Sequence, residues 1–124
     1  MPIAWEPTAA GLMQLLDDYG DDRVGIVYDV AHGWFIGEDM ASALRAVGKR
    51  LRLVQVADTD RRVCRHDAIG QGSIAFAGLP PLLAEIGYGD WPVLEIHTRD
   101  PDRGIATSIA ALLEAGFGNP PLMR

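Results

Sequence analysis

Four short apolar segments alternate with four amphipathic segments, and this alternation limits the possible folds more than any other feature of the chain. The apolar segments at 2–6, 23–30, 51–58 and 91–97 have the length and composition of buried strands. The amphipathic segments repeat apolar residues every three or four positions, as one face of a helix does. Alternating strands and helices form parallel sheets covered by helices, so the sequence predicts an α/β fold with the order βαβαβαβα.

Local signals place the helix ends. Thr8 is a favourable N-cap for the first helix, and basic residues close the second helix at 37–50. Pro80–Pro81 fits the first turn of the third helix. Asp102 is the predicted cap of the fourth helix, whose apolar face is Ile105, Ile109, Leu112 and Leu113, and Gly116 follows its end.

The length of 124 residues predicts a single domain over 1–124. Two architectures fit four strand–helix units. One is a small doubly wound open sheet, and the other is half of a TIM (β/α)8 barrel, whose complete form takes about 250 residues. The periodicity of the apolar residues does not choose between them.

Charge and composition exclude several classes of partner and location. The net charge of −6 disfavours a nucleic-acid partner, since phosphate binding relies on clustered Lys and Arg. The N-terminal residues do not resemble a signal peptide, and no apolar run is long enough to span a membrane. Cys64 is the single cysteine, which favours a reducing compartment. We therefore expect a cytoplasmic protein.

Each predicted strand ends in a polar residue that stands two positions after an apolar one. Side chains two apart point to the same side of a strand, so the polar residues form a layer above an apolar layer. The apolar layer is Ala4, Val27, Leu53 and Val93, and the polar layer is Glu6, Asp29, Gln55 and Glu95. A single acidic residue at a strand end is usually solvated or caps a helix, but four polar residues in one register favour the mouth of a half-barrel.

The polar layer predicts a metal site. Glu6, Asp29 and Glu95 would repel one another unless a cation joined them. Oxygen ligands favour a hard divalent ion, Mn²⁺ or Mg²⁺, and Gln55 would supply a neutral carbonyl oxygen.

Several segments together resemble a known family. They are VGIVYDVAHGWFIGED, RLRLVQVADTD, HDAIGQGSIAF and EIGYGDWPVLEI, and they are similar to the C-terminal half of the sugar-phosphate isomerase/epimerase family, the xylose-isomerase-like TIM barrels. The resemblance runs from about residue 23, and more loosely from residue 3. Asp29-x-x-His32, Gln55 with Asp58, Gly70-x-Gly72, and Gly87–Tyr88 followed by Glu95 occur in the order typical of the family.

The resemblance implies a metal-dependent isomerase or epimerase of sugars or sugar phosphates, and it implies roles for these residues. Glu6, Asp29, Gln55 and Glu95 would be the metal ligands, and Glu6 and Glu95 would also transfer a proton through an enediolate. The substrate would be a carbohydrate or a related polyol acid. His32 would contact this substrate, although a solvent-facing loop histidine fits its position equally well.

The loop before Gly70 adds two candidate substrate-binding residues. Arg65 and His66 lie where they would meet a hydroxyl or phosphate group. The glycines Gly70 and Gly72 favour a turn with positive φ over a phosphate motif. His97 has the parity of Glu95, which would turn it toward the mouth, although its segment also fits an ordinary polar loop.

Two further interpretations stay open. Gln55 stands where the family most often has His, and Gln there is similar to the branch of 3-dehydroshikimate dehydratases, which are lyases. The chain could also be a non-catalytic, truncated half-barrel. An open half-barrel exposes its sheet edges and inner apolar layer, so we expect a homodimer or a complementary half-barrel chain to cover them.

Overall fold

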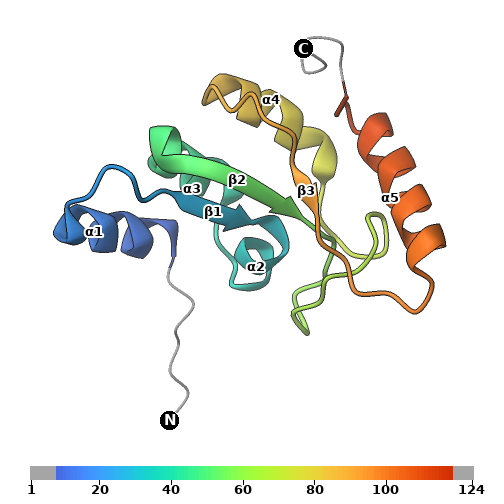
Figure 1. Cartoon of the computed structure of the whole chain (residues 1–124). Coiled ribbons are helices and arrows are strands. Elements are labelled where there is room, and N and C mark those ends of the chain that lie inside the picture. Colours follow the sequence, from blue (N-terminus) through green and yellow to red (C-terminus); the bar gives the residue numbers. More distant parts are fainter. Residues whose placement is uncertain (1–7, 119–124) are drawn as a thin grey trace.

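An open parallel sheet forms the centre of the computed structural model, which describes residues 8–118 (Figure 1). The strands β1 (Ile26–Asp29), β2 (Leu51–Val56) and β3 (Val93–Leu94) are adjacent in that order. The α/β class and the parallel sheet are thus confirmed, and the described sheet is not closed. The first predicted strand, with Glu6, lies outside the described residues.

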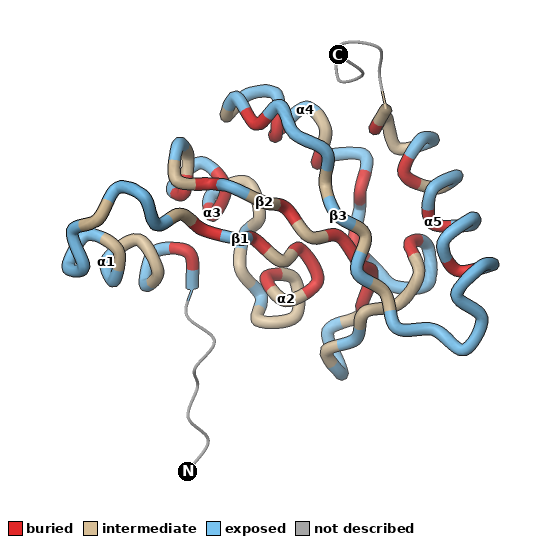
Figure 2. Tube along the Cα trace, viewed as in Figure 1, coloured by how far each residue is buried: buried red, intermediate tan, exposed pale blue. Residues whose placement is uncertain are grey.

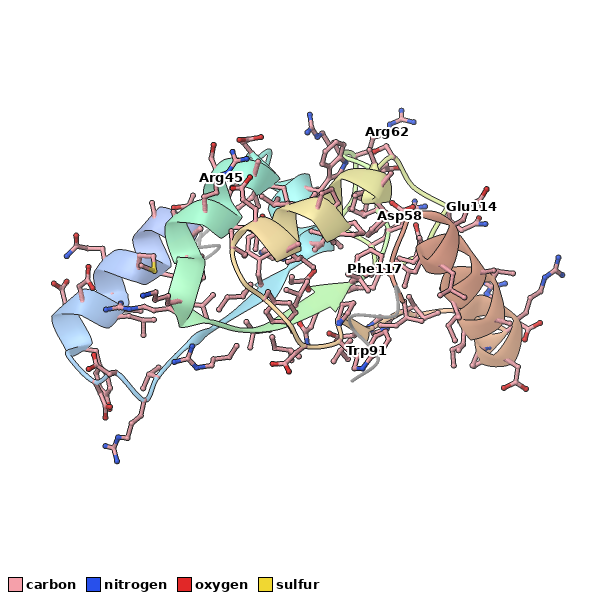
Figure 3. All side chains as sticks on the ribbon, turned by 90° about the horizontal axis from the view of Figure 1, so that it is seen from above. Arg45, Asp58, Arg62, Trp91, Glu114 and Phe117 are labelled. Atoms are coloured by element: carbon pink, nitrogen blue, oxygen red, sulfur yellow. The ribbon has the colours of Figure 1, made fainter. Side chains whose placement is uncertain are left out.

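Five α-helices connect and cover these strands within the described part of the chain. They are α1 (Ala9–Tyr19), α2 (Val30–Phe35), α3 (Met40–Val47), α4 (Leu79–Glu85) and α5 (Pro101–Glu114). The 3₁₀ turns η1 (Gly48–Arg50) and η2 (Phe76–Gly78) follow α3 and precede α4. Figure 3 shows α3 and α4 over one face of the sheet. The short helix α2 has no counterpart among the predicted elements.

Most of the predicted helix ends are confirmed. The hydroxyl of Thr8 accepts a hydrogen bond from the amide of Gly11, and Pro80–Pro81 lies in the first turn of α4. Gly116 follows α5 with φ +107°, the left-handed backbone that favours glycine. The predicted cap Asp102 is wrong. Asp100 caps α5 instead, because Pro101 starts the helix and leaves Asp100 in the capping position.

The two faces of the sheet differ in burial (Figure 2). Tyr28, Val54 and Val56 point into the core under the helices. On the other face Val27 and Val93 are 51% and 44% exposed. This alternation agrees with the parity expected from the sequence. Two residues of the layer predicted to line a barrel interior, Val27 and Val93, are thus open to solvent in the described chain.

Helix α5 packs differently from the prediction. Ile105, Ile109 and Leu113 are 44%, 49% and 56% exposed, whereas Leu112 is buried as expected. The buried stripe instead contains Gly104 and Ser108 with Leu112, because small residues let the helix approach the neighbouring loop segments closely.

Between residues 8 and 118, no helix combines the length and apolar character needed to cross a membrane.

Candidate functional site

Asp29 connects β1 to the candidate site. It ends β1 and caps α2, since its Oδ1 accepts a hydrogen bond of 3.1 Å from the amide of His32. Its Oδ2 lies 3.0 Å from Nε2 of His66, which donates when that ring nitrogen carries the proton. Asp29 therefore caps a helix and contacts His66 at once, because its two carboxylate oxygens serve different partners.

Gln55 and Glu95 extend the site across the sheet. Gln55 is the direct register partner of Asp29, and on its other side it pairs with Val93. Glu95 stands two residues after Val93, and its amide donates a 3.0 Å hydrogen bond to the carbonyl of Val56. Strand alternation thus places all three side chains toward the open face at the carboxyl ends of the strands.

The chemistry of these donors fits a hard divalent cation. Asp29 offers carboxylate lone pairs beyond its two hydrogen bonds. The side chains of Gln55 and Glu95 form no hydrogen bond with another residue between 8 and 118. In that range no three His, Cys, Asp or Glu side chains are grouped for metal binding. The predicted set has only two such residues there, since Gln55 is an amide and Glu6 is not described.

Two histidines, His66 and His32, lie beside Asp29. Besides contacting Asp29, His66 packs its ring against that of His97, with centroids 5.4 Å apart. The backbone amide of His97 donates a 2.7 Å hydrogen bond to the carbonyl of His66. His32 lines a small cavity of about 140 Å³ beside β1, together with Asp29. The exposed Arg65 instead lines a different cavity, so the predicted substrate residues divide between two places.

Asp58 organises the loop that carries His66, and the sequence reasoning missed this role. It is only 1% exposed. Its Oδ1 accepts hydrogen bonds from the amides of Thr59 at 2.9 Å and Ile74 at 3.2 Å, and its Oδ2 accepts one from Gly70 at 2.8 Å. One buried carboxylate therefore fixes both ends of the loop at residues 57–75. The sequence does contain a signal for this role of Asp58: it stands three residues after Gln55 and is followed by a glycine-containing loop.

Further contacts hold this loop in place. Asp58 and Asp67 form an isolated antiparallel bridge with two hydrogen bonds of 2.8 Å. Trp34 of α2 donates a 3.0 Å hydrogen bond from its indole to the hydroxyl of Ser73. In Figure 3 Asp58 lies in the interior, while Arg62 at the tip of the loop points outward. The loop is therefore anchored at its base and solvated at its tip.

Glycine is required at the two loop positions for different physical reasons. Gly70 has φ +100°, which confirms the predicted positive-φ turn at that position. Gly72 does not have a positive φ. A Cβ at Gly72 would overlap the backbone of Thr59 and the carboxylate of Asp58. Close approach, and not turn geometry, requires glycine there.

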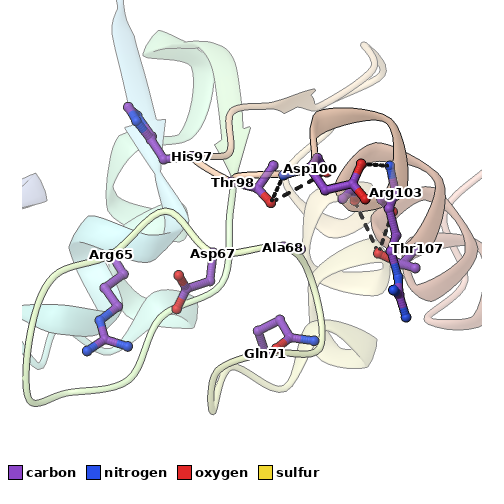
Figure 4. Close-up of a pocket in the computed structure, with 10 residues that line it drawn as sticks. Arg65, Asp67, Ala68, Gln71, His97, Thr98, Asp100, Arg103 and Thr107 are labelled. Carbon is purple, nitrogen blue, oxygen red and sulfur yellow. Dashed lines mark hydrogen bonds between the residues drawn. The ribbon is translucent and has the colours of Figure 1, made fainter.

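A second and larger cavity, here named the loop cavity, lies between this loop and the start of α5 (Figure 4). Its volume is about 420 Å³. The side chains that line it come from the loop, from the segment after β3 and from the first turns of α5, and they include Arg65, Asp67, Gln71, His97, Arg103 and Thr107.

Three solved structures share this fold. A D-tagatose 3-epimerase-like protein is 22% identical with a TM-score of 0.67, and the match covers 86% of this chain and 42% of that one. The 3-keto-D-glucoside 4-epimerase YcjR from E. coli, in its apo form, is 24% identical with a TM-score of 0.72, covering 87% and 40%. A xylose isomerase domain protein from Planctomyces limnophilus is 23% identical with a TM-score of 0.66, covering 88% and 42%.

This chain spans about two fifths of the length of those structures. A search of curated proteins finds no significant match. The sequence model of the xylose isomerase-like TIM barrel family, however, matches residues 2–115, which is nearly the whole chain. The chain belongs to the xylose isomerase-like TIM barrel family.

Proposed function

We propose that this chain supplies half of a divalent-metal-dependent active site that isomerises or epimerises a sugar or sugar phosphate. The family, together with an epimerase and an epimerase-like protein among the structural neighbours, supports a carbohydrate substrate. The observation that carries the proposal is that Asp29 and Gln55 are register partners at the strand ends. His66 forms a hydrogen bond with the same Asp29 carboxylate.

Four residues would hold the metal in this proposal. They are Asp29, Gln55 and Glu95, together with Glu6, which lies outside the described residues. Mn²⁺ or Mg²⁺ fits the carboxylate and amide oxygens of this set. Such a cation would draw electrons from two adjacent substrate oxygens and so acidify the C–H bond beside the carbonyl.

The protein residues would then move the proton. Glu95 is exposed on the open face and has no side-chain partner among residues 8–118, so its carboxylate is available to accept a proton from the substrate carbon. Glu6, which lies outside the described residues, would act as the acid–base partner. His66 holds the Asp29 carboxylate in place, and His32, beside Asp29, would hydrogen-bond a substrate hydroxyl.

Metal-dependent stabilisation tests the proposal. We expect Mn²⁺ or Mg²⁺ to raise the thermal unfolding midpoint of the wild-type chain, since a ligand that binds only the folded state stabilises it. Glu95→Gln should abolish this shift. The matched control is Glu114→Gln, because Glu114 is an exposed carboxylate near the far end of α5. If neither ion shifts the wild-type midpoint, the metal site is wrong and a non-catalytic half-barrel is favoured.

Gln55 favours a second candidate, a lyase of the 3-dehydroshikimate dehydratase type. An amide ligand in place of the usual histidine replaces a basic nitrogen donor with a neutral, less basic oxygen donor. Incubation with 3-dehydroshikimate, compared with a panel of ketoses and ketose phosphates, separates the two candidates. Loss of one water from dehydroshikimate identifies the lyase, and interconversion of a ketose identifies the isomerase or epimerase.

The open face of the sheet supports a further part of the proposal, an assembled barrel. Val27 and Val93 are exposed there, and β3 has β2 as its only strand neighbour in the described sheet. A second copy of the chain would bring the number of strand–helix units to that of a complete barrel. It would also cover an apolar layer that soluble proteins avoid exposing.

A further inference from the structure

We propose that the loop cavity is a second binding subsite, which takes a neutral polyhydroxylated unit such as the second sugar ring of a glycoside. This inference rests on the proposed carbohydrate function and extends it to a larger substrate. The cavity has the polar groups, the charge balance and the volume that such a ligand requires.

The position of the loop cavity links it to the candidate metal site. His97 lines the cavity, its ring packs against His66, and His66 is bonded to Asp29. His97 and Thr98, in the segment that follows β3 and Glu95, also line the loop cavity (Figure 4). A substrate with one ring at Asp29 would therefore extend past His97 into the loop cavity.

Several polar groups of the cavity are available to a ligand. The side chains of Arg65, Asp67, Gln71 and Arg103 form no hydrogen bond or ion pair within residues 8–118. The guanidinium groups donate, the carboxylate accepts, and the amide does both. Adjacent sugar hydroxyls need this mixture, because each hydroxyl is both a donor and an acceptor.

The charges disfavour an anionic ligand such as phosphate. Arg65 and Arg103 are balanced by Asp67 and Asp100, so the formal charge of the lining is zero with neutral His97. The start of α5 does not attract an anion either, since Asp100 already accepts a hydrogen bond from the amide of Arg103. The lining therefore matches a neutral ligand that offers both donors and acceptors.

Direct contacts join the segments that form the walls of the cavity. Ser108 of α5 is fully buried, and its hydroxyl accepts a 3.0 Å hydrogen bond from the amide of Ile69 in the loop. A Cβ on Gly104 would lie 2.9 Å from the Thr98 methyl group, so the segment after β3 also rests on α5. The volume of about 420 Å³ lies within the usual range for small-molecule sites.

Chemical-shift titration of the ¹⁵N-labelled chain tests the inference. The probes are methyl glucoside, maltose and inorganic phosphate. We expect the saccharides, and not phosphate, to shift the amides of Asp67, Gln71 and Thr98. The double variant Asp67→Asn with Gln71→Ala should weaken saccharide binding by about tenfold, which corresponds to about 1.4 kcal/mol. Asp90→Asn, an exposed carboxylate outside the cavity, is the matched control.

The outcomes separate this inference from the proposed function. Stronger shifts with phosphate than with either saccharide, or no saccharide shift at these amides, would overturn the subsite. Mn²⁺ binding, followed by the electron paramagnetic resonance of the free ion, reports on the metal site alone. It should be equal in the wild type and the double variant. If the wild-type chain shows the saccharide shifts but binds no Mn²⁺, the subsite is supported and the metal-dependent mechanism is contradicted.

Discussion

At the scale of single residues, Asp58 holds the loop near the candidate site through one buried side chain. Its buried carboxylate accepts three backbone hydrogen bonds. Asp58→Ala would leave three amide donors unpaired, and we expect a loss of about 3 kcal/mol in the free energy of unfolding. Asp58→Asn should lose less, because one oxygen remains to accept. Urea unfolding measures both, and an Asp58→Ala loss no larger than that of exposed Asp90→Ala would contradict the assignment.

A second prediction at this scale concerns Tyr28 and pH. Burial, and then the nearby carboxylate of Glu38, raise the pKa of the Tyr28 hydroxyl well above its ordinary value of 10.0. The unfolded chain therefore loses this proton at lower pH than the folded chain. Stability from this group is complete below about pH 10 and falls as the pH rises further.

Tyr28→Phe should remove this part of the pH dependence. We expect the free energy of unfolding to decline less steeply in the variant than in the wild type between about pH 9 and about pH 11. Tyr19→Phe is the control, since Tyr19 is 68% exposed. Parallel pH profiles for wild type and Tyr28→Phe would show that the hydroxyl titrates normally.

At the scale of elements, the sequence predicted the existence of strands and helices better than their extent. The apolar run at 91–97 yields only Val93–Leu94 as β3, because β2 is its single strand neighbour in the described chain. Its extension is still visible in the backbone bonds of Glu95 and His97. The short helix α2 carries no long periodic pattern, and its start depends on a side-chain contact of Asp29.

One buried side-chain contact joins helix α5 to the loop at residues 57–75, and its removal can be tested. The Ser108 hydroxyl joins α5 to the loop through the amide of Ile69. Ser108→Ala leaves that buried amide unpaired, so we expect a loss of about 2 kcal/mol and faster hydrogen exchange at Ile69. Thr107→Ala, which removes only hydrogen bonds within the helix, is the control. Unchanged exchange at Ile69 in Ser108→Ala would refute the coupling.

At the scale of the whole molecule, the parity of strand residues was the most informative sequence signal. It placed Asp29, Gln55 and Glu95 on one face, since alternation along a strand is fixed by backbone geometry. The contact of His66 with Asp29 was not predictable, because a loop between distant elements brings them together. The same holds for the loop cavity, whose lining residues are up to 42 positions apart between Arg65 and Thr107.

The open face of the sheet leads to the last prediction. Val27 and Val93 are exposed valines on that face. If a second copy covers them, the wild-type chain should scatter light as a dimer, and Val27→Glu with Val93→Glu should scatter as a folded monomer, because burying two carboxylates at an interface is costly. Val63→Glu, at a 53% exposed loop valine, should remain dimeric. Circular dichroism checks that the double variant keeps its helices. A wild-type monomer that unfolds in one cooperative transition would contradict the assembly, since it would show that the open layer is stable in water.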